Sequence, residues 1–80
     1  MHETHIIEPI IKGIVEHAQD QGAKSVTKVR LRFGLMMGLK EESFKETFSV
    51  LAKGTILENA EIEFTSFPGA AVKVISFDIE

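Results

Sequence analysis

The sequence predicts an α+β fold in which two amphipathic helices pack on one face of a three-stranded mixed β-sheet. Two stretches place apolar residues three and four positions apart, as helices do, and three stretches alternate apolar and polar residues, as half-buried strands do. Their order along the chain is helix, strand, helix, strand, strand. Eighty residues suffice for one hydrophobic core but not for two, so we expect a single domain over residues 1–80.

The first helix is expected in the N-terminal quarter of the chain. Its apolar positions are Ile6, Ile7, Ile10, Ile11, Ile14, Val15 and Ala18. Pro9 cannot donate a hydrogen bond to the carbonyl of His5, so we expect either an irregular first turn or a regular helix that begins near Glu8. Gly22 suits the turn that ends the helix.

The first strand is expected from Val26, where the apolar period changes to two. One face carries Thr27, Val29, Leu31 and Phe33, and the other carries Lys28, Arg30 and Arg32. Three basic residues on one face suit either a phosphate-binding surface or cross-strand ion pairs. The outer faces of the two later strands carry Glu61, Glu63, Asp78 and Glu80. This complementarity favours the ion-pair interpretation.

An apolar loop and the second helix follow. Residues 34–39 contain two glycines and two methionines, which is unusual because surface connections are normally polar. We therefore expect another part of the chain to cover this loop, with Met36 and Met37 packed in the core; thioether binding of a soft metal is the alternative. The second helix is expected from about Glu41 to Lys53, and its apolar face comprises Phe44, Phe48, Leu51 and Ala52.

The last two strands flank a short turn. Ile62 and Phe64 alternate with glutamates in the second strand, and Ile75, Phe77 and Ile79 mark one face of the third. A strand-helix-strand unit favours a parallel crossover, whereas the Pro-Gly turn at residues 67–69 favours an antiparallel neighbour. The sheet should therefore be mixed, with both helices on its apolar face.

Composition excludes several functions. A net charge of −3 argues against a nucleic-acid binder that relies on bulk charge, and the absence of cysteine removes disulfides, thiolate nucleophiles and cysteine-built zinc sites. The N-terminus does not resemble a secretory signal and no stretch reaches membrane-spanning length, so we expect a cytoplasmic protein without membrane contact. No spacing typical of a nucleophile with its base, and no phosphate-binding glycine loop, indicates an enzyme.

The first three residues are the candidate metal site. The α-amine of Met1, the deprotonated backbone nitrogen of His2 and the His2 imidazole can close two fused chelate rings on one cation. Glu3 can offer a carboxylate oxygen as a fourth donor. A planar set of nitrogen and oxygen donors suits Ni(II) or Cu(II) and suits tetrahedral zinc poorly. His5, three residues after His2, either faces the same metal or is solvated.

The chain also resembles the HypA/HybF nickel metallochaperones over nearly its whole length. The matching segments are Met1-His2-Glu3, Ala18 to Ala23, Ser25 to Leu31, Gly34, Gly38 to Glu41, Gly54-Thr55 and Glu58 to Glu63. The resemblance implies a non-catalytic protein that binds nickel through the terminal nitrogen and the His2-Glu3 pair, for maturation of [NiFe] hydrogenase and, in some bacteria, urease. It implies two partners, the HypB GTPase and the hydrogenase large-subunit precursor.

The chain departs from that family in two places. The family normally inserts a second lobe, which holds zinc through two CxxC pairs, between its second and third strands; here the chain runs straight on between about residues 67 and 71, without cysteine. We therefore expect the nickel-binding domain alone, without zinc, either as a natural short form or as an engineered deletion. Lys40 occupies a place in the loop where the family usually has Asp or Pro, which argues against an extra metal ligand there.

Two further alternatives remain open from the sequence. The short bridge between the last two strands permits a monomer, or a dimer that exchanges its last strand if the bridge is too tight. The runner-up function is a metal-independent protein-interaction module that uses the loop from Leu35 to Leu39 or an unpaired strand edge.

Overall fold

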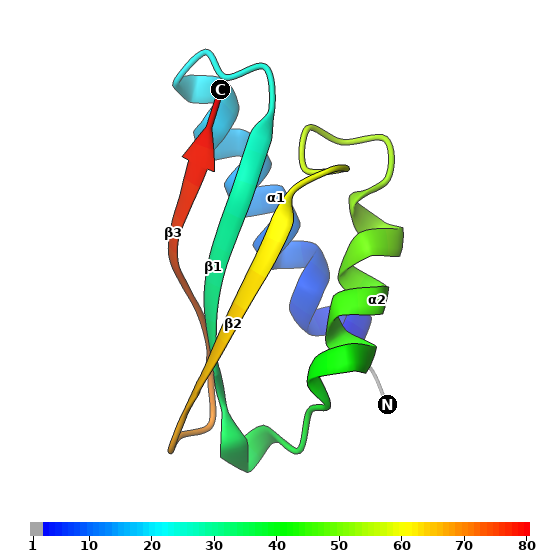
Figure 1. Ribbon diagram of the computed structural model, residues 1–80, viewed down its shortest axis with the longest axis vertical. Helices are drawn as coiled ribbons and strands as arrows, with labels where there is room; N and C mark the ends of the chain where they lie inside the picture. The colour runs from blue at the N-terminus through cyan, green and yellow to red at the C-terminus, as the bar shows by residue number, and fades with distance from the viewer. Residues whose placement is uncertain (1–2) are drawn as a thin grey trace.

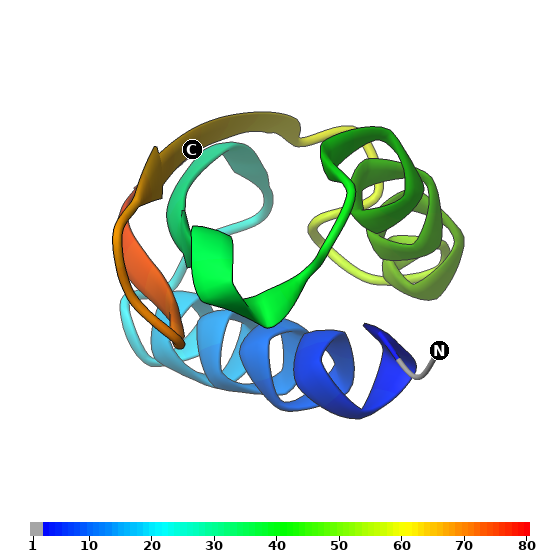
Figure 2. The same cartoon turned by 90° about the horizontal axis from the view of Figure 1, so that it is seen from below.

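The computed structural model describes residues 3–80 and has two helices on one side of a three-stranded sheet (Figures 1 and 2). The elements are α1 (Glu3–Asp20), β1 (Val26–Gly34), the 3-10 turn η1 (Leu35–Met37), α2 (Glu41–Ala52), β2 (Glu61–Phe67) and β3 (Val72–Ile79). This is the α+β fold, with the element order, that the sequence predicts. Within residues 3–80, neither helix combines the length and the apolar character needed to cross a bilayer.

The sheet is mixed and its strand order is β2-β1-β3. Strand β1 pairs with β2 in parallel and with β3 in antiparallel orientation. The Pro-Gly turn therefore does not make a hairpin of β2 and β3, because the antiparallel neighbour of β3 is β1. All three strands belong to one chain, so the short bridge is long enough to join them without strand exchange.

Residues 68–71 join β2 to β3 by passing over the end of β1. The backbone N–H of Gly34 donates to the carbonyl of Ala71 at 2.8 Å, and that of Met36 donates to the carbonyl of Gly69 at 2.9 Å. A β-carbon at Gly34 would overlap the Gly69 carbonyl and lie 2.8 Å from the backbone nitrogen of Ala70. The crossing is therefore possible because residue 34 has no side chain.

The core lies between the sheet and the two helices. Its buried side chains are Ile7, Ile11, Ile14, Ala18, Val26, Val29, Leu31, Phe44, Phe48, Ala52 and Leu57. Aromatic side chains fill the core between α2 and the sheet. The Phe44 ring meets Phe64 edge-on, with 4.7 Å between centroids, and stacks on Phe48 with 6.5 Å between centroids. Burial of these apolar faces stabilises the fold and holds both helices on the same side of the sheet.

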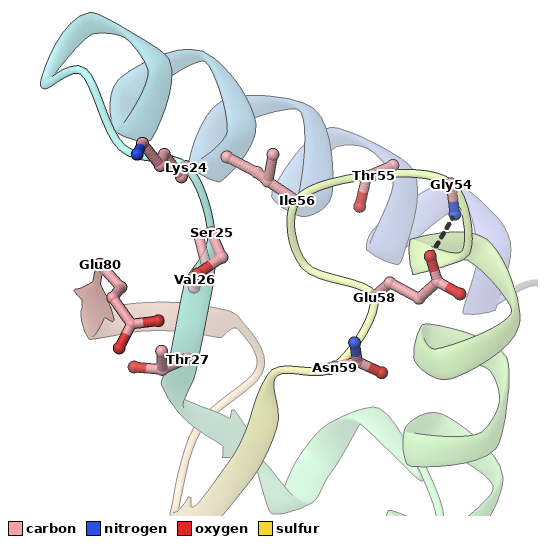
Figure 3. Close-up of a pocket in the computed structure, with 10 residues that line it drawn as sticks. All are labelled: Lys24, Ser25, Val26, Thr27, Gly54, Thr55, Ile56, Glu58, Asn59 and Glu80. Atoms are coloured by element: carbon pink, nitrogen blue, oxygen red, sulfur yellow. Dashed lines mark hydrogen bonds between the residues drawn. The ribbon is translucent and has the colours of Figure 1, made fainter.

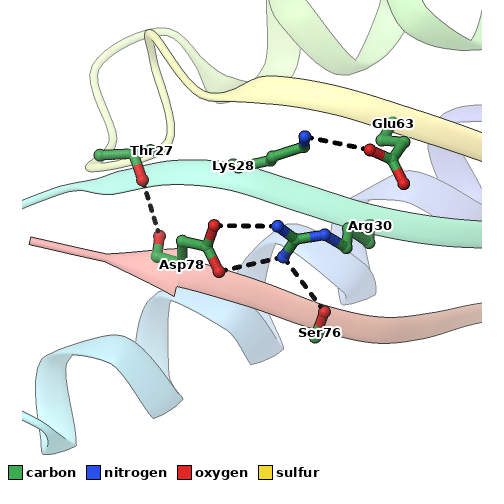
Figure 4. A network of polar contacts seen from close by, with 6 residues as sticks. All are labelled: Thr27, Lys28, Arg30, Glu63, Ser76 and Asp78. Carbon is green, nitrogen blue, oxygen red and sulfur yellow. Dashed lines mark hydrogen bonds and ion pairs between the residues drawn. The ribbon is translucent and has the colours of Figure 1, made fainter.

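The outer face of the sheet carries a polar network (Figure 4). Lys28 reaches Glu63 on β2 at 3.0 Å, and the Arg30 guanidinium donates two hydrogen bonds to the Asp78 carboxylate on β3, at 3.0 and 3.1 Å. The hydrogen bond from Arg30 is the main reason why the pKa of Asp78 is lowered. The ion-pair interpretation is confirmed for these two basic residues. It is wrong for Arg32, whose guanidinium lies over the Phe67 ring instead, 5.2 Å from the centroid.

Two other expectations are corrected. Helix α1 begins at Glu3 and includes Pro9, although proline cannot donate to the carbonyl of His5. Ile7, on the same first turns, is completely buried, and this packing outweighs the missing hydrogen bond. The apolar loop is covered only in part. Leu35 is 61% and Met36 79% exposed at the end of the sheet, whereas Met37 and Leu39 are half-buried and Leu39 packs against the core.

Candidate metal centre

The candidate site lies at the start of α1. Met1 and His2 fall outside the residues that the structure describes, and α1 begins at Glu3, whose side chain also falls outside that description. The arrangement of these three ligands is therefore still a prediction from the sequence. What the structure adds is the described backbone to which they are attached, a regular helix that begins directly after His2.

A helix start is suited to the proposed chelation. The first four N–H groups of a helix have no acceptor within it, so a metal can replace an amide proton there without breaking a helical hydrogen bond. Because α1 begins at Glu3, the amide of His2 precedes the first turn. The positive end of the helix dipole stabilises negative groups such as a deprotonated amide or the Glu3 carboxylate, while it opposes the cation itself. The negatively charged ligands must therefore supply the attraction.

His5 and Glu8 are the described polar side chains nearest to this site in sequence. Both are exposed on α1, and residues three apart lie on the same side of a helix. The structure describes His5 on the first turn of α1, and a part for it in the metal site is still a prediction from the sequence. Among the side chains that the structure describes, no three His, Asp or Glu residues converge in a way that could hold a metal ion.

His17 lies at the other end of α1. At 1.5 Å per residue it is about 21 Å along the helix from Glu3, too far to share a metal with the chain start. Its ring meets Phe77 of β3 edge-on, with the centroids 5.6 Å apart. This histidine therefore packs α1 against β3 and serves as a histidine control for metal-binding experiments.

A polar hollow of about 610 Å³ opens at the end of the molecule where α1 finishes (Figure 3). Three segments that are distant in sequence line it, which is why sequence periodicity did not reveal it. Lys24 comes from the α1–β1 turn, Glu58 and Asn59 come from the α2–β2 connection, and Glu80 follows β3. The Glu58 carboxylate accepts a hydrogen bond from the backbone N–H of Gly54 at 3.3 Å, so it stabilises the α2–β2 connection.

The chain belongs to a family of metallochaperones for nickel incorporation. The family model that matches, over residues 1–72, is HypA, described as hydrogenase/urease nickel incorporation, metallochaperone. Three relatives with the name hydrogenase maturation factor HypA show the degree of similarity. The protein of Beijerinckia indica is 37% identical over 89% of this chain, that of Archaeoglobus fulgidus 40% over 81%, and that of Dehalococcoides mccartyi 37% over 85%.

The match covers only part of each relative. This chain aligns with 63%, 59% and 57% of the lengths of those three proteins, so it spans about three fifths of them. The family match ends at Val72, the first residue of β3, directly after the short crossing of β1. The family resemblance seen in the sequence is thus confirmed, and it covers the start of the chain, α1, β1, α2 and β2.

Proposed function

We propose that this chain is a nickel-binding domain that holds Ni(II) through the α-amine of Met1, the backbone nitrogen and imidazole of His2, and the Glu3 carboxylate. The proposal is supported by family membership, by a match that starts at residue 1, and by the overlap of this tripeptide with a helix start at Glu3, where the first amides are not used in helical hydrogen bonds. The family match carries most weight. We propose no catalytic role, since the task of a metallochaperone is to bind and release its metal.

The second part of the proposal concerns domain content. We take residues 1–80 as the nickel-binding domain alone, with the cysteine-rich zinc lobe missing between about residues 67 and 71. Support comes from the absence of cysteine, from the direct passage of residues 68–71 between β2 and β3, and from coverage of only about three fifths of the relatives. No zinc is then required for folding, because the core is built from the two helices and the sheet.

The third part concerns delivery. Donor atoms that belong to one short stretch of chain can be displaced one at a time by an incoming ligand, which favours transfer of the metal to another protein. We propose [NiFe] hydrogenase maturation, or urease maturation, as the purpose, with the HypB GTPase and the hydrogenase large-subunit precursor as partners. The cytoplasmic location expected from the sequence belongs to this proposal.

The experiment is calorimetric titration of Ni(II) into the chain with a free Met1 amine, into His2→Ala, and into a form extended by a few residues before Met1. We expect both altered forms to bind at least about tenfold more weakly, which corresponds to about 1.4 kcal/mol. His17→Ala is the matched control and should bind as the wild type does, because His17 lies at the other end of α1. Equal affinity in all four proteins would refute the site.

Spectroscopy identifies the ligands independently of affinity. Square-planar Ni(II) bound through a deprotonated amide gives a weak yellow d–d absorption band, which should disappear in the extended form. Cu(II) should compete for the same donors and bind more tightly, as the general order of divalent metals requires. For this reason affinity in vitro does not by itself identify the metal that the protein carries in the cell.

A metal-independent interaction module is the second candidate function. The observation that favours it is the exposure of Leu35 and Met36, which form an apolar tip at the end of the sheet. If this function is correct, binding to a partner is weakened by Leu35→Ser and Met36→Ser and is unchanged by Ni(II) or by His2→Ala. The opposite pattern supports nickel transfer.

A further inference from the structure

Strand β3 presents an unusual free edge. It lies at the outside of the sheet, in the order β2-β1-β3. Three of its side chains are large, apolar and exposed: Val74 at 40%, Ile75 at 53% and Ile79 at 41%. An unpaired strand edge with exposed apolar side chains is a template for pairing with another strand, and proteins normally protect such edges with charges or a covering segment.

The other edge of the sheet is different. Strand β2 exposes Glu61, Glu63 and Thr65, while its apolar residues Ile62 and Phe64 are half-buried under the helices. Charged residues on an edge discourage pairing. The exposed apolar surface of the sheet is thus concentrated on β3.

An irregularity in β3 makes this strand complementary to itself. Its register with β1 shifts between Ser76 and Val74, so Ile75 has no partner on β1. On both sides of this bulge, the residues opposite apolar β1 positions face the helices, and these are Val72, Val74, Phe77 and Ile79. The residues opposite the basic side chains of β1 face outward, and these are Lys73, Ser76 and Asp78.

We infer that two copies of this chain pair through the free edges of β3, antiparallel to each other and related by a two-fold axis, to form one continuous six-stranded sheet. In the register proposed, Val72 lies opposite Ile79 of the second copy, Lys73 opposite Asp78, and Val74 opposite Phe77. The axis passes between Ile75 and Ser76. Apolar residues then meet apolar residues on the helix side, and opposite charges meet on the outer side at both ends.

Neighbouring registers do not share this complementarity. A shift by one residue places Lys73 opposite Phe77 or Ile79, and it sets outward residues against inward ones along the whole strand. The proposed pairing depends on the bulge. In a regular strand, residues an odd number of positions apart lie on opposite faces, so Lys73 and Asp78 would face opposite sides; the bulge brings both to the outer face.

The surroundings of Lys73 support the inference. In the single chain it lies opposite Arg32 of β1, a residue of the same charge, and its ammonium lies 5.4 Å from the centre of the Phe67 ring that Arg32 also covers. Among the described residues no carboxylate forms an ion pair with Lys73. A carboxylate from a second copy would relieve this repulsion, and Asp78 has room for it beside Arg30 because its side chain is half exposed.

The helix side of the edge also suits a second copy. Two adjoining apolar hollows of about 390 and 260 Å³ run between α1 and β3, and both are lined by His17, Val74 and Phe77. In the proposed register, Val74 and Phe77 of the second copy come to lie beside these residues. Pairing would therefore add apolar contacts under the sheet to the backbone hydrogen bonds at its edge.

The test is sedimentation equilibrium of the full chain from micromolar to millimolar concentration. We expect a reversible dimer for the wild type. In Lys73→Glu, two like-charge pairs replace two opposite-charge pairs, and the dissociation constant should rise by about tenfold. Asp78→Lys should weaken the dimer in the same way. An equimolar mixture of the two variants should restore it, because each of the two cross-strand pairs then joins a carboxylate of one variant to an ammonium of the other.

Two controls separate edge pairing from a general effect of charge or a loss of folding. Lys40→Glu makes the same charge change away from β3, in the loop before α2, and should dimerise as the wild type does. Asp78→Lys also removes the ion-pair partner of Arg30, so circular dichroism should check that this variant is folded. If the Asp78→Lys variant is unfolded, the Lys73→Glu variant alone tests the dimer. The inference is overturned if the wild type stays monomeric at all concentrations. It is also overturned if Lys73→Glu dimerises as strongly as the wild type, which is the result expected of a strand-exchanged dimer.

Discussion

Replacing Gly34 with alanine should destabilise this protein more than its backbone conformation suggests. Gly34 has φ −80° and ψ 129°, angles that alanine adopts readily. The obstacle is steric, because the added β-carbon would overlap the carbonyl of Gly69 and lie 2.8 Å from the nitrogen of Ala70. Both contacts are with backbone atoms, so no side-chain rotation can relieve them and residues 68–71 must move.

The expected cost follows from what that movement disrupts. Overpacking costs about 1–3 kcal/mol, and each of the two backbone hydrogen bonds between this segment and residues Gly34 and Met36 contributes about 1 kcal/mol. Allowing for partial relaxation, the free energy of unfolding should fall by about 3 kcal/mol. In a domain of this size that corresponds to a melting temperature lower by about 15 °C.

The assay is thermal unfolding followed by circular dichroism at low micromolar concentration. Gly13→Ala is the matched control, because a β-carbon at Gly13 meets nothing within 4 Å and the residue lies inside α1. The control should be more stable than the wild type by about 0.5–1 kcal/mol, the usual gain for alanine over glycine in a helix. If Gly34→Ala melts at the wild-type temperature, the segment between β2 and β3 does not cross β1 at Gly34.

Three further predictions concern the core, the outer face and the apolar loop. Phe44→Ala should lower the free energy of unfolding by about 3–5 kcal/mol in urea titrations, since Phe44 is 1% exposed and contacts Phe64 edge-on; a change below about 1 kcal/mol would contradict this core. Arg30→Gln should reduce stability at pH 7 but much less at pH 3. Because the pKa of Asp78 is lowered in the folded state, the pair stabilises the fold fully above pH ~3.9, the pKa of Asp in the unfolded chain. This stabilisation is lost as the pH falls through the lower pKa of the folded state. An equal loss at both pH values would argue against this pair. Met36→Ser should change stability by less than about 0.5 kcal/mol, because Met36 is exposed, and a larger loss would restore the core-packing interpretation.

Local patterns predicted the elements well, because they report which face of an element is buried. The three-and-four spacing identified α1 and α2, and the end expected near Lys53 differs by one residue from the observed Ala52. Alternation identified β1 and β2, and the charges on the outer faces predicted cross-strand ion pairs, of which Lys28–Glu63 is one. The candidate metal site is also a prediction from the sequence, since the donor atoms of a chain start are adjacent along the chain, and it stays a prediction.

Patterns were less informative in β3 and in the loop after β1. Alternation grouped Ile75 with Phe77 on one face, yet the bulge leaves Ile75 without a partner on β1 and 53% exposed. A bulge depends on how two strands align, and nothing in the residues of β3 alone indicates it. The exposure of Met36 was missed for a similar reason, since a run of apolar residues does not reveal whether another segment lies over it.

The sequence by itself determined the fold class, the order of the elements, the faces they bury and the tripeptide that we propose as a nickel ligand. These properties depend on neighbours within a few positions along the chain, and residue periodicity records them directly. Only the tertiary structure decided that β3 pairs with β1, that Gly34 must be a glycine, and that the outer strand β3 exposes apolar side chains. Each of those properties arises where segments distant in sequence approach within a few ångströms, and the physical cause is contact between backbones or side chains that no local pattern contains.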